Sequence, residues 1–236
     1  MQSRDRGRLA SVLTGRLRHD GDVSLRRLVK RTALTAALIG AGILVRERQL
    51  QWGAAPAEVE SELPGDDLLP DARLVATRAI SIDATPTEVW PWIAQLGQGR
   101  GGFYSYDALE NLVGCEITSA DRIEAQWQAV ESGDEFRLHP DMPLTVAIAD
   151  PPGALVVQSE AAAGSENAEV PYDFTWAFVL QPSGPHGSRL IIRERYAWTT
   201  PAMRPAMEVL TLISFVMTEK MLRGIRERAE GTARTR

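Results

Sequence analysis

Residues 96–114 read LGQGRGGFYSYDALENLVG, and this stretch decides which fold the sequence supports. Its first half is rich in glycine, which lets a backbone take positive φ angles and approach another surface closely. Phe103, Tyr104 and Tyr106 follow, each with a large apolar face, and a short amphipathic segment ends at Gly114. A glycine loop that carries aromatic side chains is typical of a segment that walls or gates a pocket.

The same glycines match the dinucleotide-binding pattern GxGxxG, with an acid, Asp121, about 20 residues further on. That pattern must follow a buried β-strand. The preceding residues 85–96 instead begin like a helix, because Thr85 is a good N-cap, Pro86 suits the first helical position and Glu88 completes a capping box. The context therefore argues against a nucleotide site.

The composition is that of a globular protein. Its 236 residues are 44% hydrophobic and 24% charged, which fits one domain with an N-terminal extension. The single cysteine, Cys115, excludes an intramolecular disulfide. The three histidines are scattered and no CxxC or HExxH spacing occurs, so we expect neither a metal site nor a cofactor.

Charge divides the chain into two parts. Residues 1–31 form a basic arm with nine basic and three acidic residues (+6), whereas the remainder holds 17 basic and 28 acidic residues (−11). A basic arm can bind nucleic acid. This arm lacks interleaved aromatic residues and the rest of the chain is acidic, so we expect no nucleic-acid partner.

An apolar segment, TALTAALIGAGILV, occupies residues 32–45 within a helix predicted over residues 32–50. Fourteen residues reach only about 21 Å as a helix, short of the ~30 Å hydrocarbon core, and counting from Leu28 gives about 27 Å. Two interpretations stay open: residues 28–45 anchor the protein in a membrane, or the helix packs on the domain or on a second copy of it. The protein is accordingly membrane-associated or cytoplasmic, with its oligomeric state left open.

Residues 51–73 form an acidic linker or strap, with three prolines, two glycines and six acidic residues after Trp52. This tryptophan either lies at a membrane interface or fastens the strap to the domain, and we favour the second. The domain itself is expected over residues 74–230, with a short tail at residues 231–236.

The first strand of the domain is predicted over residues 74–82, where side chains alternate with period two. This alternation places Arg78 on the more apolar face, and a buried charge needs a partner. The capped helix that follows contains Pro91, which should bend it and direct Trp92 away from its apolar stripe. A second short helix is predicted over residues 106–113.

Beyond the second helix the period changes to two, which predicts antiparallel hairpins. The expected strands cover residues 134–139, 144–149 and 154–159. Simple alternation sends His139 away from the face of Phe136 and Leu138, as an exposed loop histidine. It also keeps Val146 and Ile148 on one face.

Two more strands are predicted over residues 172–180 and 189–198, joined by a turn over residues 181–188. One face of the first strand is wholly apolar and large: Tyr172, Phe174, Trp176, Phe178 and Leu180. In the second strand Glu194 lies on the apolar face, so it is a second charged residue, after Arg78, that points toward the expected core. If the first and last strands are neighbours, Arg78 and Glu194 can form an inward ion pair within ~4 Å.

The chain closes with a long helix predicted over residues 201–230, which Pro201 opens. Its nearly continuous apolar run, residues 209–217, is too short to span a membrane, so we expect the run to be buried against the sheet. Methionines make that contact adaptable, as the wall of a ligand cavity would be. They are Met203, Met207, Met217 and Met221.

Six segments carry a resemblance to a known family. They are ATRAISID (76–83), VWPW (89–92), GQGRGGFYSYD (97–107), ENL (110–112), ADRI (120–123) and GDEFRLHP (133–140). In these segments, and in its order of elements, the chain resembles the START-like superfamily, also called SRPBCC, which includes polyketide cyclase/dehydrase-like and Bet v 1-like lipid binders. The resemblance covers residues 74–229 and is closest to a bacterial subgroup whose members often carry an N-terminal hydrophobic helix.

The resemblance implies an α+β helix-grip fold. In this fold a curved antiparallel sheet surrounds a long C-terminal helix, two short helices follow the first strand, and here a helical extension precedes the domain. The resemblance also implies a cavity between sheet and helix for an apolar small molecule. It brings no catalytic residue set, because none of the superfamily's active groups matches this chain residue by residue.

The leading hypothesis is a protein that binds an apolar, lipid-like or polyketide-like small molecule, with catalytic residues unassigned. The expected site residues are Arg78, Trp92, Tyr104, Tyr106, Phe174, Trp176, Glu194, Tyr196 and Trp198, of which Arg78 and Glu194 would be polar anchors. An enzyme of the cyclase or dehydratase type would instead use acid and base groups among Tyr104, Tyr106, Asp107, Asp121 and His139. A structural module would fill the interior with its own side chains, whereas a pocket of roughly 300 Å³ or more on which at least two of these polar groups converge would favour binding or catalysis.

Overall fold

The computed structural model describes residues 35, 37, 40–159 and 171–234, and the chain divides into two units, residues 1–47 and 48–236. In the first unit residues 35, 37 and 40–47 are helical. The basic arm and part of the apolar segment lie outside the described residues. Within the described ranges no helix is both long enough and apolar enough to cross a membrane.

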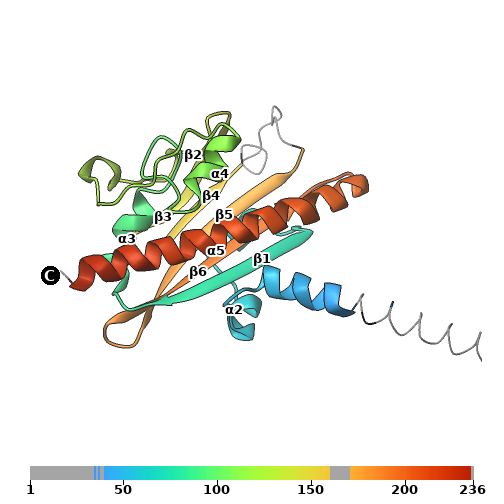
Figure 1. Ribbon diagram of the computed structural model, residues 1–236, viewed down its shortest axis with the longest axis horizontal. Coiled ribbons are helices and arrows are strands. Elements are labelled where there is room, and N and C mark those ends of the chain that lie inside the picture. The colour runs from blue at the N-terminus through green and yellow to red at the C-terminus, as the bar shows by residue number, and fades with distance from the viewer. Residues whose placement is uncertain (1–34, 36, 38–39, 160–170, 235–236) are drawn as a thin grey trace, which may run out of the picture. The chain divides into compact units, whose positions relative to one another are not determined.

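In the second unit the described residues form a six-stranded antiparallel sheet with the strand order β1-β6-β5-β4-β3-β2 (Figure 1). The strands are β1 (Leu74–Ile82), β2 (Glu135–His139), β3 (Met142–Asp150), β4 (Ala154–Gln158), β5 (Asp173–Ser183) and β6 (Gly187–Ala197). Strands β1 and β6 are neighbours, as the predicted ion pair requires. The predicted turn over residues 181–188 is shorter than expected, because Gln181 still pairs with Arg189 and Ser183 with Gly187.

In the chain, helices follow the first strand and the last strand, and the longest of them lies across one face of the sheet. After β1 come α3 (Pro86–Ala94), α4 (Asp107–Leu112) and the 3-10 turn η2 (Ala125–Trp127), and after β6 come the 3-10 turn η3 (Pro201–Met203) and the long helix α5 (Arg204–Arg234). Figure 1 shows α5 running along the face of the curved sheet. We call this the inner face and the opposite one the outer face. The predicted order and the α+β helix-grip arrangement are confirmed.

Local signals place the ends of the helices. The predicted capping box at α3 is present, because the backbone N–H of Thr85 donates to the Glu88 carboxylate at 2.8 Å. At the other end of the domain, Pro201 opens η3 rather than α5, and α5 continues past the predicted end at residue 230 to Arg234.

Two register shifts overturn the simple alternation predicted for β2 and β3. The ladder shifts between Arg137 and His139, and both Leu138 and His139 then line the inner face. A second shift, between Val146 and Ile148, leaves Val146 in the inner core and packs Ile148 on the outer face. An extra residue reverses the parity of every side chain beyond it. The predictions of an outward His139 and of a shared face for Val146 and Ile148 are therefore wrong.

The strap, residues 51–73, packs on the outer face and forms the short helix α2 (Pro56–Glu60) and the 3-10 turn η1 (Asp66–Leu68). Leu63 and Leu68 join the small outer cluster of the sheet, made by Ala79, Val156, Ala177, Val179 and Ile191. Trp52 packs against the main core, and the Arg223 guanidinium lies 5.6 Å from the centre of its ring. The tryptophan thus fastens the strap, as predicted.

The apolar run of α5 is only partly buried, which corrects the prediction made from its sequence. Within the run Val209, Leu212, Ile213 and Val216 are exposed, whereas Thr211 is buried. A helix has about 3.6 residues per turn, so a continuous apolar run points to all sides while the sheet covers one of them.

Candidate ligand cavity

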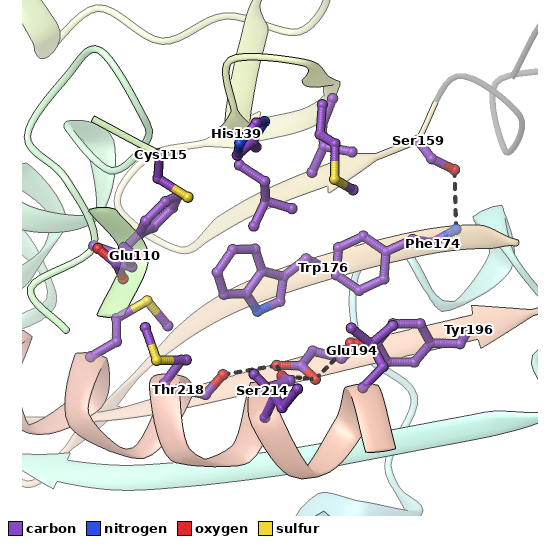
Figure 2. A pocket seen from close by; sticks show the side chains of 18 of the residues that line it. Glu110, Cys115, His139, Ser159, Phe174, Trp176, Glu194, Tyr196, Ser214 and Thr218 are labelled. Atoms are coloured by element: carbon purple, nitrogen blue, oxygen red, sulfur yellow. Dashed lines mark hydrogen bonds between the residues drawn. The ribbon is translucent and has the colours of Figure 1, made fainter. Parts of the chain in front are cut away.

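A cavity of about 360 Å³ lies between the inner face and α5 (Figure 2). Its wall is predominantly apolar. Helix α5 contributes Leu210, Ile213, Ser214, Met217, Thr218 and Met221. This volume is above the threshold of roughly 300 Å³ set for a ligand pocket, which argues against an interior filled by the protein's own side chains.

Glu194 of β6 lies at the wall on the α5 side and is the centre of a polar cluster. Arg78 of β1 pairs with it through Nη1 and Oε1 at 2.9 Å, with both side chains buried, so the predicted ion pair is confirmed. Three hydroxyl groups also donate to this carboxylate: Tyr196 at 3.1 Å, Ser214 at 2.7 Å and Thr218 at 2.9 Å. Burial, followed by the charge of Glu194, raises the pKa of Tyr196 well above its usual value, so its hydroxyl stays a donor.

Aromatic rings of β5 and β6 form the floor of the cavity. The ring centres of Phe174 and Tyr196 are 4.8 Å apart, and Trp176 lies 6.3 Å from Phe174 and 6.1 Å from Phe103. Figure 2 shows Trp176 in the middle of this floor. The indole Nε1 of Trp176 is buried and finds no hydrogen-bond partner within residues 40–159 and 171–234.

The stretch predicted to wall a pocket contributes Phe103, Glu110 and Val113 to the cavity wall, and its glycine loop also joins α3 to α5. Tyr104 has a positive φ of 57°, and its hydroxyl donates to the Trp92 carbonyl at 3.1 Å and accepts from Gln95 Nε2 at 2.8 Å. The Arg228 guanidinium lies 4.6 Å from the centre of the Tyr104 ring. Gly224 of α5 permits the contact, since a Cβ there would meet the Tyr104 carbonyl oxygen at 2.3 Å. Of the loop's aromatic residues, Phe103 lines the cavity.

Four of the nine predicted site residues reach the cavity wall: Phe174, Trp176, Glu194 and Tyr196. Their part in ligand binding stays a prediction. Arg78 lies behind Glu194, and Trp92 is buried against Tyr104 with ring centres 5.8 Å apart, so the bend at Pro91 does not aim Trp92 at a ligand. The last two are also absent from the wall: Tyr106 is exposed at the start of α4 and Trp198 is buried beyond the end of β6.

The acid and base groups proposed for an enzyme do not converge. Asp107 accepts from the backbone N–H and hydroxyl of Ser119 at 2.8 and 2.6 Å, and Asp121 lies near Arg228 at the surface. His139 alone of the five reaches the wall, where its Nδ1 accepts from the Asp141 N–H and its Nε2 therefore donates to the Val113 carbonyl at 3.1 Å. Among the described residues no group of three or more potential ligands could hold a metal ion.

Glu110 is an acidic wall residue that is not among the site residues expected from the sequence. It lies on α4 and is 8% exposed, and its Oε2 is buried without a hydrogen-bond partner in the described part of the chain. Burial, followed by the charge of Asp107, raises the pKa of Glu110 to about 7. Glu110 was not expected on the wall because the apolar residues Leu109 and Leu112 suggested that their side of α4 is buried. They are instead 51% and 81% exposed.

Glu110 should make the stability of the protein depend on pH. Its folded pKa of about 7 exceeds its unfolded value of 4.5, so the unfolded state binds fewer protons between these values and stability falls as pH rises from about 4.5 to about 7. We expect a loss of at most about 3 kcal/mol across this window. Urea unfolding at several pH values measures it. Glu110→Gln should flatten this part of the profile, whereas Glu116→Gln, which removes an exposed carboxylate nearby, should leave the slope in place; an unchanged slope in Glu110→Gln would contradict the assignment.

Comparison with known proteins reveals similarity in structure alone. No family model matches the chain, and no curated protein matches it. Similar solved structures include a polyketide-cyclase-like protein of Corynebacterium glutamicum, with 13% identity, coverage of 68% of this chain and 94% of that chain, and a TM-score of 0.40. A norcoclaurine synthase from Thalictrum has 11% identity, 68% and 96% coverage and a TM-score of 0.40. The di-domain ARO/CYC protein StfQ of the steffimycin pathway has 12% identity, 72% and 54% coverage and a TM-score of 0.44.

These identities and scores are too low to support an argument about activity. The assignment of the fold rests on this chain's own architecture: the strand order, the two short helices after β1 and the long helix α5 along the inner face. The same architecture places the cavity where the family resemblance implied one. The chain therefore has the helix-grip fold of the START-like, or SRPBCC, superfamily that its sequence resembles.

Proposed function

We propose that the protein binds an apolar small molecule, lipid-like or polyketide-like in character, between the inner face and α5. The single observation that carries this proposal is the cavity of about 360 Å³ with a predominantly apolar wall. A ligand of matching shape would remove apolar surface from water at both partners, which stabilises a complex by about 25 cal/mol for each Å² buried.

The polar groups on the wall favour binding over catalysis. Glu194 accepts from four donors, Arg78, Tyr196, Ser214 and Thr218, so its carboxylate oxygens are engaged within the protein. A catalytic site needs an acid or base within hydrogen-bond reach of a second reactive group. The candidates from the sequence are dispersed, so the proposal includes no reaction.

The cavity can be tested with a matched pair of substitutions on α5. Met217 lines the cavity, whereas its neighbour Val216 is exposed and lies off the wall. Wild-type protein should bind the neutral probe 4-phenylbutan-1-ol with one-to-one stoichiometry in isothermal titration calorimetry. We expect Met217→Trp to weaken binding at least tenfold, because the larger side chain occupies the cavity, and Val216→Trp to change it less than twofold.

Two results would contradict the proposal. One is the absence of saturable binding by the wild type. The other is an equal effect of the two tryptophan substitutions, which would place the probe outside the cavity. Separately, native mass spectrometry of protein purified from its own host would identify a ligand that copurifies.

A further inference from the structure

The cavity wall contains an acid with a carboxyl oxygen that no described residue pairs with. Glu110 is more than nine-tenths buried, and its Oε2 has no hydrogen-bond partner among the residues that the structure describes. Figure 2 shows Glu110 with Cys115 at one end of the cavity and Ser159 at the other. The second carboxylate of the wall, Glu194, is fully occupied by its own donors.

The burial of Glu110 runs against the simplest packing of α4. This short helix exposes Leu109 and Leu112 and turns its glutamate inward. Packing for stability alone favours the opposite orientation, since an unpaired buried acid is destabilising. A ligand that pairs with the carboxyl group would offset that loss.

The charge of the wall indicates which ligand suits it. Glu110 and Glu194 are acids, and the wall includes neither lysine nor arginine among the described residues, because Arg78 lies behind Glu194. An anionic ligand would therefore meet two acids and no free cation. A cationic ligand would meet Glu110 together with the faces of Phe103 and Trp176, which also attract cations. On the wall formed by the described residues, the other buried polar atom without a partner is Trp176 Nε1, which is a donor and does not compete for a cation's hydrogen bonds.

We propose that the cavity selects an amphiphilic amine, whose ammonium group pairs with the Glu110 carboxylate while its apolar part lies along the aromatic floor. This inference rests on the proposed function and names the ligand class for the same cavity. No covalent step is involved. The amine enters as its ammonium form, and where Glu110 is protonated beforehand its proton passes to solvent.

The pH dependence of binding follows from this proton release. The titratable groups near Glu110 are Asp107 on its own helix, Cys115 after it, and His139 and Glu194 across the cavity. The wall residues of α5 include no titratable side chain. Because the pKa of Glu110 is about 7, the carboxylate form that pairs with an ammonium increases about tenfold between pH 6 and pH 8. Amine affinity should therefore rise with pH over this range, whereas alcohol affinity should not.

Three probes of one shape test the inference on the full chain: 4-phenylbutylamine, 4-phenylbutan-1-ol and 4-phenylbutanoate, titrated by calorimetry at pH 6 and pH 8. At pH 8 the amine should bind at least tenfold more tightly than the alcohol, and the carboxylate more weakly than either. At pH 6 the advantage of the amine should fall about tenfold. Titrations at pH 6 in buffers of different ionisation enthalpy should show about one proton released per amine and none per alcohol.

Substitutions then locate the effect. Glu110→Gln should remove the preference and bring the amine to within twofold of the alcohol measured on the same variant. The control Glu116→Gln removes one exposed carboxylate near the cavity and should keep the full preference for the amine. If Glu110→Gln does not fold, proton release by the wild type decides the question.

The outcomes separate the two proposals. Alcohol binding without a preference for the amine, or amine binding at pH 6 without proton release, would overturn the inference and leave the proposed function standing. An amine preference that survives in Glu110→Gln would also overturn it. Failure of all three probes to bind would overturn the proposed function itself.

Discussion

Replacing Arg78 with methionine is expected to lower the free energy of unfolding by about 3–5 kcal/mol, because it leaves the Glu194 carboxylate buried without its counter-charge. The Arg78 side chain is fully buried, and besides Glu194 at 2.9 Å it donates to the Gln49 carbonyl at 3.0 Å. Methionine keeps most of the apolar stem and removes the charge. Urea unfolding at pH 7 measures the loss.

Two further variants show whether the burial of this pair is the cause. Arg137→Met breaks an exposed pair with Glu135 and should lower the free energy of unfolding far less than Arg78→Met does. Adding Glu194→Gln to Arg78→Met removes the uncompensated charge and should restore about 1 kcal/mol or more. Equal losses in Arg78→Met and Arg137→Met would contradict the assignment of a buried ion pair.

Replacing Arg193 with methionine is expected to lower the free energy of unfolding by a similar amount, about 3–5 kcal/mol, and to release the strap from the outer face. Arg193 is buried on β6, where it pairs with Asp66 and donates to the carbonyls of Glu58 at 2.7 Å and Ser61 at 2.8 Å. Without the guanidinium, the two carbonyls and the Asp66 carboxylate lose a donor as long as the strap stays docked on the outer face. The docked state is therefore destabilised relative to the released one.

Proteolysis distinguishes release of the strap from a general loss of stability. A protease that cleaves after glutamate should cut Arg193→Met within residues 51–73 faster than it cuts the rest of the chain. The control Arg189→Met removes a more exposed arginine that pairs with Glu58, and it should cost about 1 kcal/mol or less without faster cleavage of the strap. Equal cleavage rates in wild type and Arg193→Met would show that apolar contacts such as Leu63 hold the strap without Arg193.

Much of the fold could be predicted because its signals are local. The capping box of Thr85 and Glu88 marks the start of α3, and alternation with period two predicts the strands. The pairing of Arg78 with Glu194 was also predictable across 116 residues of chain, because two charges on apolar faces need each other.

The candidate site was predicted less well, because reaching a cavity depends on small displacements. A single register shift brings His139 to the wall, and a positive φ at Tyr104 turns that side chain toward α3 and α5. The orientation of α4 buries Glu110 and exposes its leucines. This orientation is set by the packing of α4 beside the cavity and not by the amphipathic pattern of its sequence.

The residues alone predict the order of the elements, the alternation along β1, β5 and β6 and the need for an inward ion pair. Each of these follows from the chemistry of neighbouring residues. The packing of the folded chain, by contrast, leaves a cavity of about 360 Å³ between the sheet and α5 and places Glu110 on its wall. Periodicity defines the direction of a side chain from its own backbone, whereas a cavity depends on the distance between backbones that are far apart in the chain.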